Sequence, residues 1–352
     1  MHSKDSEFWI EAMKTEVLDL LSRNTWERVL RSSVPMDSNG KKYKVLKSIW
    51  AFKLKRFPDG SPQKFKARFC ARGDLQQEGI DFFDTYAPVV KWSTIRMLLI
   101  ETLSRNWVTR QVDFTNAFAQ GELSEIVFLE PPKAFEGSDG LDKVLKLHKS
   151  LYGLRQAAKT FFEKLKDGLE ERGFRQSSHD PCLFMKKDMM CVVYVDDTIF
   201  SGPNADEIEA EIKSIGICDT EQRHAFELRN EGEVNDFLGI RISKTGPKSY
   251  YLTQPGLIKK VLAHAAMENC KPVSTPAVST ALGRDEHGKE FSESWDYASI
   301  IGMLMYLSQN TRPDIAFAVH QCARFTHNPK NSHAVGVKHI LRYLKGTQDK
   351  GM

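Results

Sequence analysis

The sequence lacks several features that would assign it to a specialised class of protein. It has no apolar run near the ~18 residues that a membrane-spanning helix needs. Its first residues are polar and resemble no signal segment. The six cysteines form no Cys-x-x-Cys pair and have no histidines at zinc-ligand spacing. We therefore expect reduced thiols, no membrane partner, and a location in the cytosol or the nucleus.

Positive charge is unevenly distributed, although the net charge of +4 says little about partners. Between Lys41 and Arg72 the chain has eleven lysines and arginines, opposed only by Asp59. Aromatic and aliphatic residues alternate with these charges, which predicts that the charges lie on one face of a β-sheet. The face is either simply solvated or a phosphate-binding surface.

Hydrophobic periodicity predicts helices and strands in mixed order, without a strict βαβ repeat. Helices are expected at 9–21, from Ser93 as the N-terminal cap, and at 156–172, 254–266, 297–309, 313–326 and 333–344. Strands are expected at 43–57, 63–70, 107–114, 127–129, 144–147, 182–185, 191–195, 198–201, 236–242 and 250–252. The first two strands flank a turn at Pro58-Asp59-Gly60. This mixture predicts an α+β fold.

Asp196 and Asp197 fall between two apolar strands. Burying adjacent ionised carboxylates is costly, so the pair requires a compensating charge. Magnesium prefers hard oxygen ligands, and Asp113, near the end of another predicted strand, could be a third ligand. The alternative is an Asp-Asp turn exposed to water, because aspartate is common in turns. The residues alone leave both alternatives open.

An ordered series of motifs surrounds these aspartates. In chain order it comprises Asn24-Thr25-Trp26-Glu27, Lys66-Ala67-Arg68-Phe69-Cys70-Ala71-Arg72-Gly73, Tyr86-Ala87-Pro88-Val89-Val90-Lys91, Gln111-Val112-Asp113-Phe114-Thr115-Asn116-Ala117-Phe118, Lys149-Ser150-Leu151-Tyr152-Gly153-Leu154-Arg155-Gln156-Ala157, Tyr194-Val195-Asp196-Asp197, Phe237-Leu238-Gly239-Ile240 and Thr311-Arg312-Pro313-Asp314-Ile315. This series resembles the reverse transcriptase of copia-type (Pseudoviridae) retrotransposon Pol polyproteins along nearly the whole chain. Ala158, where such proteins usually have proline, departs from the pattern.

The resemblance implies an RNA-directed DNA polymerase that transfers nucleotides to a primer 3′-hydroxyl with two Mg²⁺ ions, for which Mn²⁺ could substitute. The implied catalytic and metal-binding residues are Asp113, Asp196 and Asp197, with a metal-binding backbone carbonyl at Phe114. Implied partners are an RNA or DNA template with its primer, and deoxynucleoside triphosphates. The implied location is a cytoplasmic virus-like particle, or the nucleus.

Further residues are assigned by the same resemblance to the nucleotide and the primer. The nucleotide-binding set is Lys66, Arg68, Arg72, Phe118, Tyr152 and Gly153. Within it, Phe118 would be a steric gate against the sugar 2′ position, or else an ordinary core phenylalanine. The primer grip is Phe237, Leu238 and Gly239, for which the alternative is an ordinary hairpin turn.

A right-hand polymerase fold is implied, with fingers, a palm built on an antiparallel sheet and a thumb, followed by a small helical connection-like subdomain. The expected boundaries are 1–23 for an N-terminal helix, 24–243 for fingers and palm, 244–270 for a thumb-like segment, 271–294 for a linker and 295–352 for the connection region. The chain is expected to stop before a ribonuclease H domain, so ribonuclease H and integrase would be supplied elsewhere. The alternative function is a truncated, inactive relic that only binds nucleic acid; a scaffold without activity is a third. The intact aspartates favour the enzyme.

Overall fold

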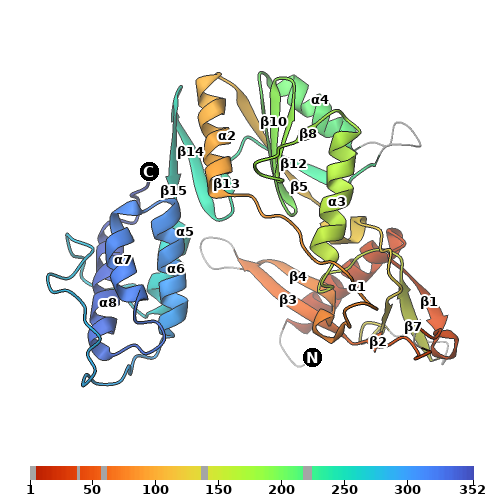
Figure 1. Ribbon diagram of the computed structural model, residues 1–352, viewed down its shortest axis with the longest axis horizontal. Coiled ribbons are helices and arrows are strands. Elements are labelled where there is room, and N and C mark those ends of the chain that lie inside the picture. The colour runs from red at the N-terminus through yellow and green to blue at the C-terminus, as the bar shows by residue number, and fades with distance from the viewer. Residues whose placement is uncertain (1–4, 38–39, 57–61, 136–141, 217–223) are drawn as a thin grey trace. The chain divides into compact units, whose positions relative to one another are not determined.

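The computed structural model describes residues 5–37, 40–56, 62–135, 142–216 and 224–352 (Figure 1). The chain divides into two compact units. The first unit comprises Met1–Leu98 and Val108–Gly232, and the second comprises Leu99–Trp107 and Glu233–Met352. The turn expected at Pro58-Asp59-Gly60 lies outside the described residues.

The first unit mixes helices with short strands. Its helices are α1 (Ser6–Ser22), α3 (Ala157–Glu170) and α4 (Ala205–Gly216), with 3-10 turns η1 (Arg31–Ser33), η2 (Gly73–Leu75) and η3 (Ala117–Gln120). Its strands are β1 (Trp26–Leu30), β2 (Val45–Leu46), β3 (Ser48–Arg56), β4 (Pro62–Ala71), β5 (Val108–Phe114), β6 (Phe128–Leu129), β7 (Lys143–Leu147), β8 (Arg175–Gln176), β9 (Leu183–Lys186), β10 (Met189–Tyr194), β11 (Asp197–Gly202) and β12 (Leu228–Gly232). The helix α2 (Trp92–Ser104) continues from the first unit into the second.

A six-stranded sheet, in the order β12-β5-β11-β10-β9-β8, forms the centre of the first unit. One face of this sheet packs against α3 and α4 (Figure 1). The strand β5 shows why: Val112 and Phe114 alternate with Asp113, so the pleat buries the two apolar side chains in the helix-covered core. Asp113 is therefore directed to the opposite face.

The antiparallel hairpin β3–β4 has two chemically different faces. The register pairs Lys53 with Lys66 and Lys55 with Lys64, and places Arg68 on the same face. The opposite face is aromatic and contacts α1, where Trp9 packs edge-on against two phenylalanines of the hairpin. The prediction that the basic residues lie on one face of a sheet is thus confirmed for these five residues, whereas Lys41, Lys42, Lys44, Lys47 and Arg72 lie outside the hairpin.

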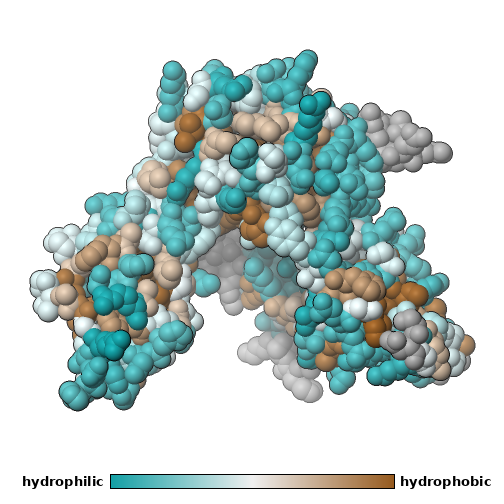
Figure 2. Space-filling model, viewed as in Figure 1, coloured by the Kyte–Doolittle hydropathy of each residue, from teal (hydrophilic) through white to brown (hydrophobic). Residues whose placement is uncertain are grey.

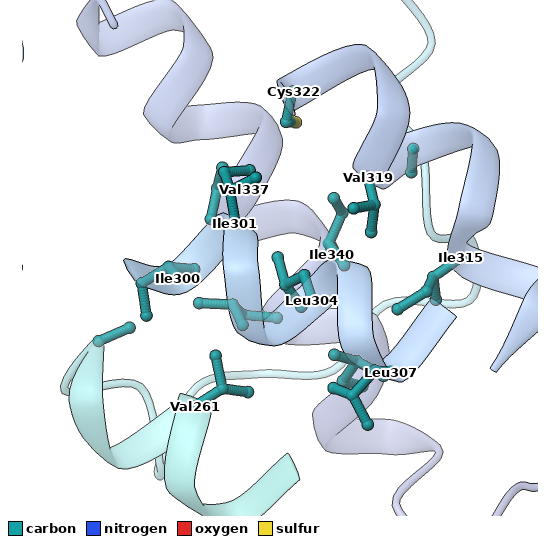
Figure 3. Close-up of a cluster of buried hydrophobic side chains, with 14 of the residues drawn as sticks. Val261, Ile300, Ile301, Leu304, Leu307, Ile315, Val319, Cys322, Val337 and Ile340 are labelled. Atoms are coloured by element: carbon teal, nitrogen blue, oxygen red, sulfur yellow. The ribbon is translucent and has the colours of Figure 1, made fainter. Parts of the chain in front are cut away.

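The second unit has a helical core beside a three-stranded sheet. Its elements are β13 (Asp236–Phe237), β14 (Ile240–Gly246), β15 (Ser249–Thr253), α5 (Pro255–His264), α6 (Tyr297–Asn310), η4 (Pro313–Ile315), α7 (Ala316–Ala323) and α8 (Asn331–Gly346). Buried aliphatic side chains of α5, α6, α7 and α8 converge in one cluster (Figure 3). The segment from 271 to 294 contains no helix or strand, and Leu282 and Phe291 pack against this cluster.

One buried guanidinium joins two ends of the helical core. The Arg312 side chain is 1% exposed and forms two hydrogen bonds to Asp314, with Nη2–Oδ2 at 2.8 Å. It also donates to the carbonyl oxygen of Thr347 at 2.8 Å, at the C-terminal end of α8. The Thr311-Arg312-Pro313-Asp314-Ile315 motif therefore has a structural role in the second unit.

The α+β prediction is confirmed, with three local differences. The strand expected at 236–242 is divided by a turn at Leu238 and Gly239, both with positive φ, into β13 and β14. The helix expected to be capped by Ser93 begins earlier, at Trp92. One helix, α4, and three strands, β1, β8 and β12, were not predicted. In α4, Asn204 Oδ1 accepts the backbone N–H of Glu207, which starts the helix.

Among the described residues, no helix is both long and apolar enough to cross a membrane. On the face shown in Figure 2, hydrophilic residues cover most of the surface and hydrophobic residues appear in separate patches.

Candidate active site

Three aspartates meet at the ends of the central strands of the first unit. Asp113 near the end of β5 lies directly opposite Asp197, the first residue of β11. Directly opposed residues of antiparallel strands project from the same face, with Cβ atoms roughly 5 Å apart. The third aspartate, Asp196, is in the turn, and its carbonyl oxygen accepts the backbone N–H of Phe114 at 2.9 Å. This bond ties the turn to the end of β5.

The turn between β10 and β11 has only two central residues, because Tyr194 pairs with Asp197. Val195, the first of them, has φ of 53°. Left-handed φ values occur in the turns that suit two-residue hairpins, but a β-branched residue is strained there. Backbone strain of this kind is concentrated at functional sites in proteins. The strained turn lowers local stability, and it fixes the positions of Asp196 and Asp197.

The carboxylates repel one another in a partly dehydrated environment. Burial, together with the charges of Asp196 and Asp113, raises the pKa of Asp197 to about 6. The pKa of Asp196 is also raised, mainly by burial and further by Asp113, although Arg68 and Lys66 lower it. Both shifts indicate that the protein only partly compensates the negative charge of the aspartates.

These carboxylates fit Mg²⁺ by their chemistry. They are hard oxygen donors whose repulsion a divalent cation would relieve. In the described part of the chain, no three acidic, histidine or cysteine side chains form a ready-made cation site. Mg²⁺ commonly binds to one or two carboxylates and completes its shell with water and substrate phosphates, rather than in an all-protein cage. The arrangement therefore suits a metal shared with a phosphorylated substrate.

Two of the three predicted triphosphate-binding cations lie near the aspartates. Lys66 and Arg68, on the basic face of β4, both act electrostatically on Asp196. Burial and the neighbouring cations Arg68 and Lys55 lower the pKa of Lys66. The positive charge of the hairpin face is therefore not balanced by nearby acidic residues. Arg72 differs, because its guanidinium forms two hydrogen bonds to Asp74, at 2.6 and 2.7 Å.

An aromatic pair, Phe118 and Tyr152, lies between Arg68 of β4 and the turn η3 that follows β5. The rings of Phe118 and Tyr152 meet edge to face with centroids 4.7 Å apart, and the Arg68 guanidinium lies 4.5 Å from the Tyr152 ring centroid. Burial raises the pKa of Tyr152 further from neutrality, so the phenol stays protonated. Phe118 is half-buried and also packs against two core clusters. The gate and the core interpretations of Phe118 both remain open.

Gly153 permits a close approach between the Tyr152 turn and the base of the hairpin. Its φ is +91°, and a Cβ atom there would lie 2.2 Å from the carbonyl oxygen of Ala71. Gly73 meets the same turn, since its Cβ would lie 2.0 Å from the Gly153 carbonyl oxygen. The backbone geometry therefore requires glycine at position 153.

A profile of the family described as "Reverse transcriptase (RNA-dependent DNA polymerase)" matches residues 33–279, which is most of the chain. The chain belongs to this reverse transcriptase family. It is 34% identical over 350 residues to the Retrovirus-related Pol polyprotein from transposon RE1 of Arabidopsis thaliana, covering 98% of this chain and 23% of that polyprotein. It is likewise 34% identical over 350 residues to the one from transposon TNT 1-94 of Nicotiana tabacum, covering 96% and 25%. The resemblance to copia-type Pol polyproteins is confirmed.

The chain spans about a quarter of the length of these curated relatives. A solved structure of the foamy viral protease-reverse transcriptase in complex with double-stranded DNA matches 96% of this chain and 48% of that chain, with a TM-score of 0.44 and 14% identity.

The residues of the predicted primer grip belong to the second unit. Phe237 is fully buried there, while Leu238 and Gly239 form the two-residue turn between β13 and β14. The carbonyl oxygen of Leu238 accepts the Tyr306 hydroxyl at 2.8 Å. These contacts anchor the turn within its own unit, and its role as a primer grip stays a prediction.

Sequence reasoning missed a cation beside the aspartates. Arg229 of β12 is the register partner of Asp113 on the side away from β11. Its side chain is 73% exposed and lies 3.8 Å from Glu231. No local signal could identify it, because β12 has little hydrophobic alternation and its pairing with β5 depends on the tertiary fold.

Proposed function

We propose that this chain is an RNA-directed DNA polymerase, which joins deoxynucleotides to the 3′-hydroxyl of a primer. The observation that carries the proposal is the group of three aspartates, with Asp113 opposite Asp197 and Asp196 in the adjoining turn. Their negative charge is only partly compensated, by Lys66 and Arg68 on the neighbouring hairpin. Such a site suits phosphoryl transfer, in which the protein contributes position and electrostatic stabilisation.

Asp113, Asp196 and Asp197, with the backbone carbonyl of Phe114, would hold two Mg²⁺ ions, for which Mn²⁺ could substitute. When bound, the metal lowers the pKa of the primer hydroxyl and offsets charge on the phosphates. Asp197 must lose its proton before it can act as a ligand, so its raised pKa makes ligation favourable only above the acid range. The proposal thus predicts that activity falls in acid.

Lys66 and Arg68 would bind the triphosphate, because their charges already act on Asp196. A guanidinium matches phosphate oxygens in pairs, which favours Arg68 as the orienting group. Arg72 would join them only after releasing Asp74. Phe118 and Tyr152 with Gly153 would flank the nucleotide sugar and base, and Phe237, Leu238 and Gly239 would support the primer.

The remaining assignments follow from the family. Residues 24–243 would be fingers and palm, 244–270 the thumb, and 295–352 the connection, joined by the linker at 271–294. The partners would be a primed RNA or DNA template, deoxynucleoside triphosphates and other segments of a Pol polyprotein. The chain would act in a cytoplasmic virus-like particle or in the nucleus.

A primer-extension assay tests the proposal. Purified chain should extend a DNA primer on an RNA template with Mg²⁺, and Asp196→Asn should abolish extension while duplex binding is retained. Asp188, exposed in the turn between β9 and β10, provides the matched control, and Asp188→Asn should extend normally. Absence of incorporation by the wild-type chain with both Mg²⁺ and Mn²⁺ would overturn the proposal.

A further inference from the structure

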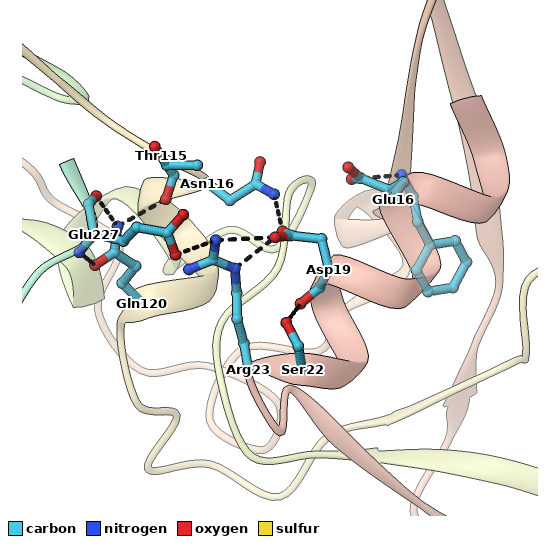
Figure 4. A network of polar contacts seen from close by, with 9 residues as sticks. Glu16, Asp19, Ser22, Arg23, Thr115, Asn116, Gln120 and Glu227 are labelled. Carbon is cyan, nitrogen blue, oxygen red and sulfur yellow. Dashed lines mark hydrogen bonds and ion pairs between the residues drawn. The ribbon is translucent and has the colours of Figure 1, made fainter. Parts of the chain in front are cut away.

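The helix α1 is joined to the strand end of the active site by a network of charged and polar side chains (Figure 4). Asp19 accepts two hydrogen bonds from Arg23, at 3.0 and 3.1 Å, and a third at 2.5 Å from the side-chain amide of Asn116. Arg23 also reaches Glu227 at 2.5 Å, although its side chain is only 10% exposed. The matched family segment begins at residue 33, after α1.

Asn116 is the residue through which this network reaches the site. It follows the strand that carries Asp113, has a left-handed φ of 47°, and begins the 3-10 turn containing Phe118. Its carbonyl oxygen accepts the N–H of Ala119, which closes that turn. A left-handed asparagine is held by side-chain hydrogen bonds, and Asp19 supplies the partner here.

The other end of the network joins the two strands beside Asp113. The Gln120 side chain donates to the carbonyl oxygens of Thr115 and Glu227, at 2.7 and 2.8 Å, and accepts the N–H of Glu227 at 2.9 Å. Thr115 follows β5 and Glu227 precedes β12, so the amide bridges both strand ends. Arg23 therefore reaches the same bridge through the Glu227 carboxylate.

A second contact fixes the helix to the hairpin that carries Lys66 and Arg68. The Glu16 carboxylate, 7% exposed, accepts the backbone N–H of Phe69 at 3.3 Å. The apolar side chains of Met13, Val17 and Leu20 are buried. The helix is thus a rigid element shared by the hairpin and the strand end, rather than an appendage.

We infer that Asp19 and Arg23 of α1 are positioning residues, which hold Asn116 and thereby orient Phe118 for nucleotide selection. The inference rests on the proposed polymerase function for its kinetic consequence, but its structural part is independent of activity. Loss of the Asp19 carboxylate leaves the Asn116 amide unpaired and allows η3 to relax. Misplacement of a group by about 1 Å can cost about 100-fold in rate, so an effect on selectivity is expected without contact to substrate.

The experiment compares Asp19→Ala and Asn116→Gly with wild type. Glycine tolerates the left-handed φ of residue 116 but cannot bind Asp19, so it removes the tether without disturbing α1 packing. The control is Glu11→Ala, because Glu11 lies on the same helix and its side chain is 72% exposed and forms a 3.8 Å ion pair with Lys14. Asp19→Asn retains an acceptor and should give a weaker effect than alanine.

Two measurements distinguish the inference from the proposed function. Hydrogen exchange should accelerate in the peptide covering residues 115–121 in both test variants and stay unchanged in Glu11→Ala. In primer extension, the preference for deoxynucleotides over ribonucleotides should fall about tenfold, with unchanged affinity for primer-template.

Unchanged exchange in that peptide would overturn the inference even if the wild-type chain is active. Equal losses for both nucleotides, with a constant preference, would overturn the selection role. A wild-type chain without activity would refute the proposed function, while exchange would still decide whether α1 positions the turn.

Discussion

Replacing Asp197 by asparagine should stabilise the first unit of the chain while abolishing nucleotide incorporation. The substitution keeps the shape of the side chain but removes a charge that burial, Asp196 and Asp113 all disfavour. Groups whose pKa is strongly perturbed are concentrated at functional sites, where stability is reduced in favour of chemistry. The prediction therefore separates the requirement for folding from the requirement for catalysis.

The magnitude follows from the pKa of Asp197, raised from 3.8 to about 6. In this window the folded state binds more protons than the unfolded state, so stability decreases as pH rises from about 4 to about 6. Each pKa unit corresponds to about 1.4 kcal/mol, and solvent screening of this partly exposed side chain reduces the sum to about 1–2 kcal/mol. Asparagine should recover that amount at pH 7.5 and nothing at pH 3.5.

The assay is equilibrium unfolding of wild type and Asp197→Asn at both pH values, without divalent cations. Each kcal/mol should shift the midpoint temperature of a unit this large by about 2–4 °C. Asp188→Asn, in an exposed turn, should change stability by less than about 0.5 kcal/mol. Adding Mg²⁺ should raise the stability of wild type more than that of the variant. An asparagine variant no more stable than wild type at pH 7.5, or equally stabilised at pH 3.5, would refute the reasoning.

Three further predictions concern single positions. Arg312→Met should destabilise the second unit by about 2–3 kcal/mol in urea unfolding, because it removes the hydrogen bonds of a buried guanidinium to Asp314 and Thr347; a loss below about 1 kcal/mol would contradict this structural role. Gly153→Ala should cost far more stability than Gly239→Ala, since both have positive φ but only the first places a Cβ against backbone, 2.2 Å from Ala71; equal losses in thermal unfolding would show that φ alone matters. Val195→Gly should stabilise the first unit by about 1 kcal/mol by relieving the left-handed valine, and an unchanged melting temperature would exclude that strain.

Local sequence determined most of the secondary structure and the chemical identity of the site. Hydrophobic periodicity sufficed for α1, α3 and the C-terminal helices because their buried faces recur at helical spacing. The alternation of charged and aromatic residues predicted the two-faced hairpin, because successive side chains of a strand point to opposite faces of the sheet. The ordered motifs around Asp113 and the Asp196-Asp197 turn identified the family, since chain order of motifs is carried by sequence itself.

Tertiary structure decided what no local pattern contains: which residues from distant segments meet. Strand register brought Asp197 opposite Asp113 and Arg229 beside it, and register depends on the packing of whole sheet faces. The pairing of Arg72 with Asp74, and the approach of Lys66 and Arg68 to Asp196, likewise required coordinates. The same holds for the tether from Asp19 to Asn116, which joins residues 97 positions apart. Such contacts form only when distant segments of the chain pack together. No local sequence pattern therefore predicts them.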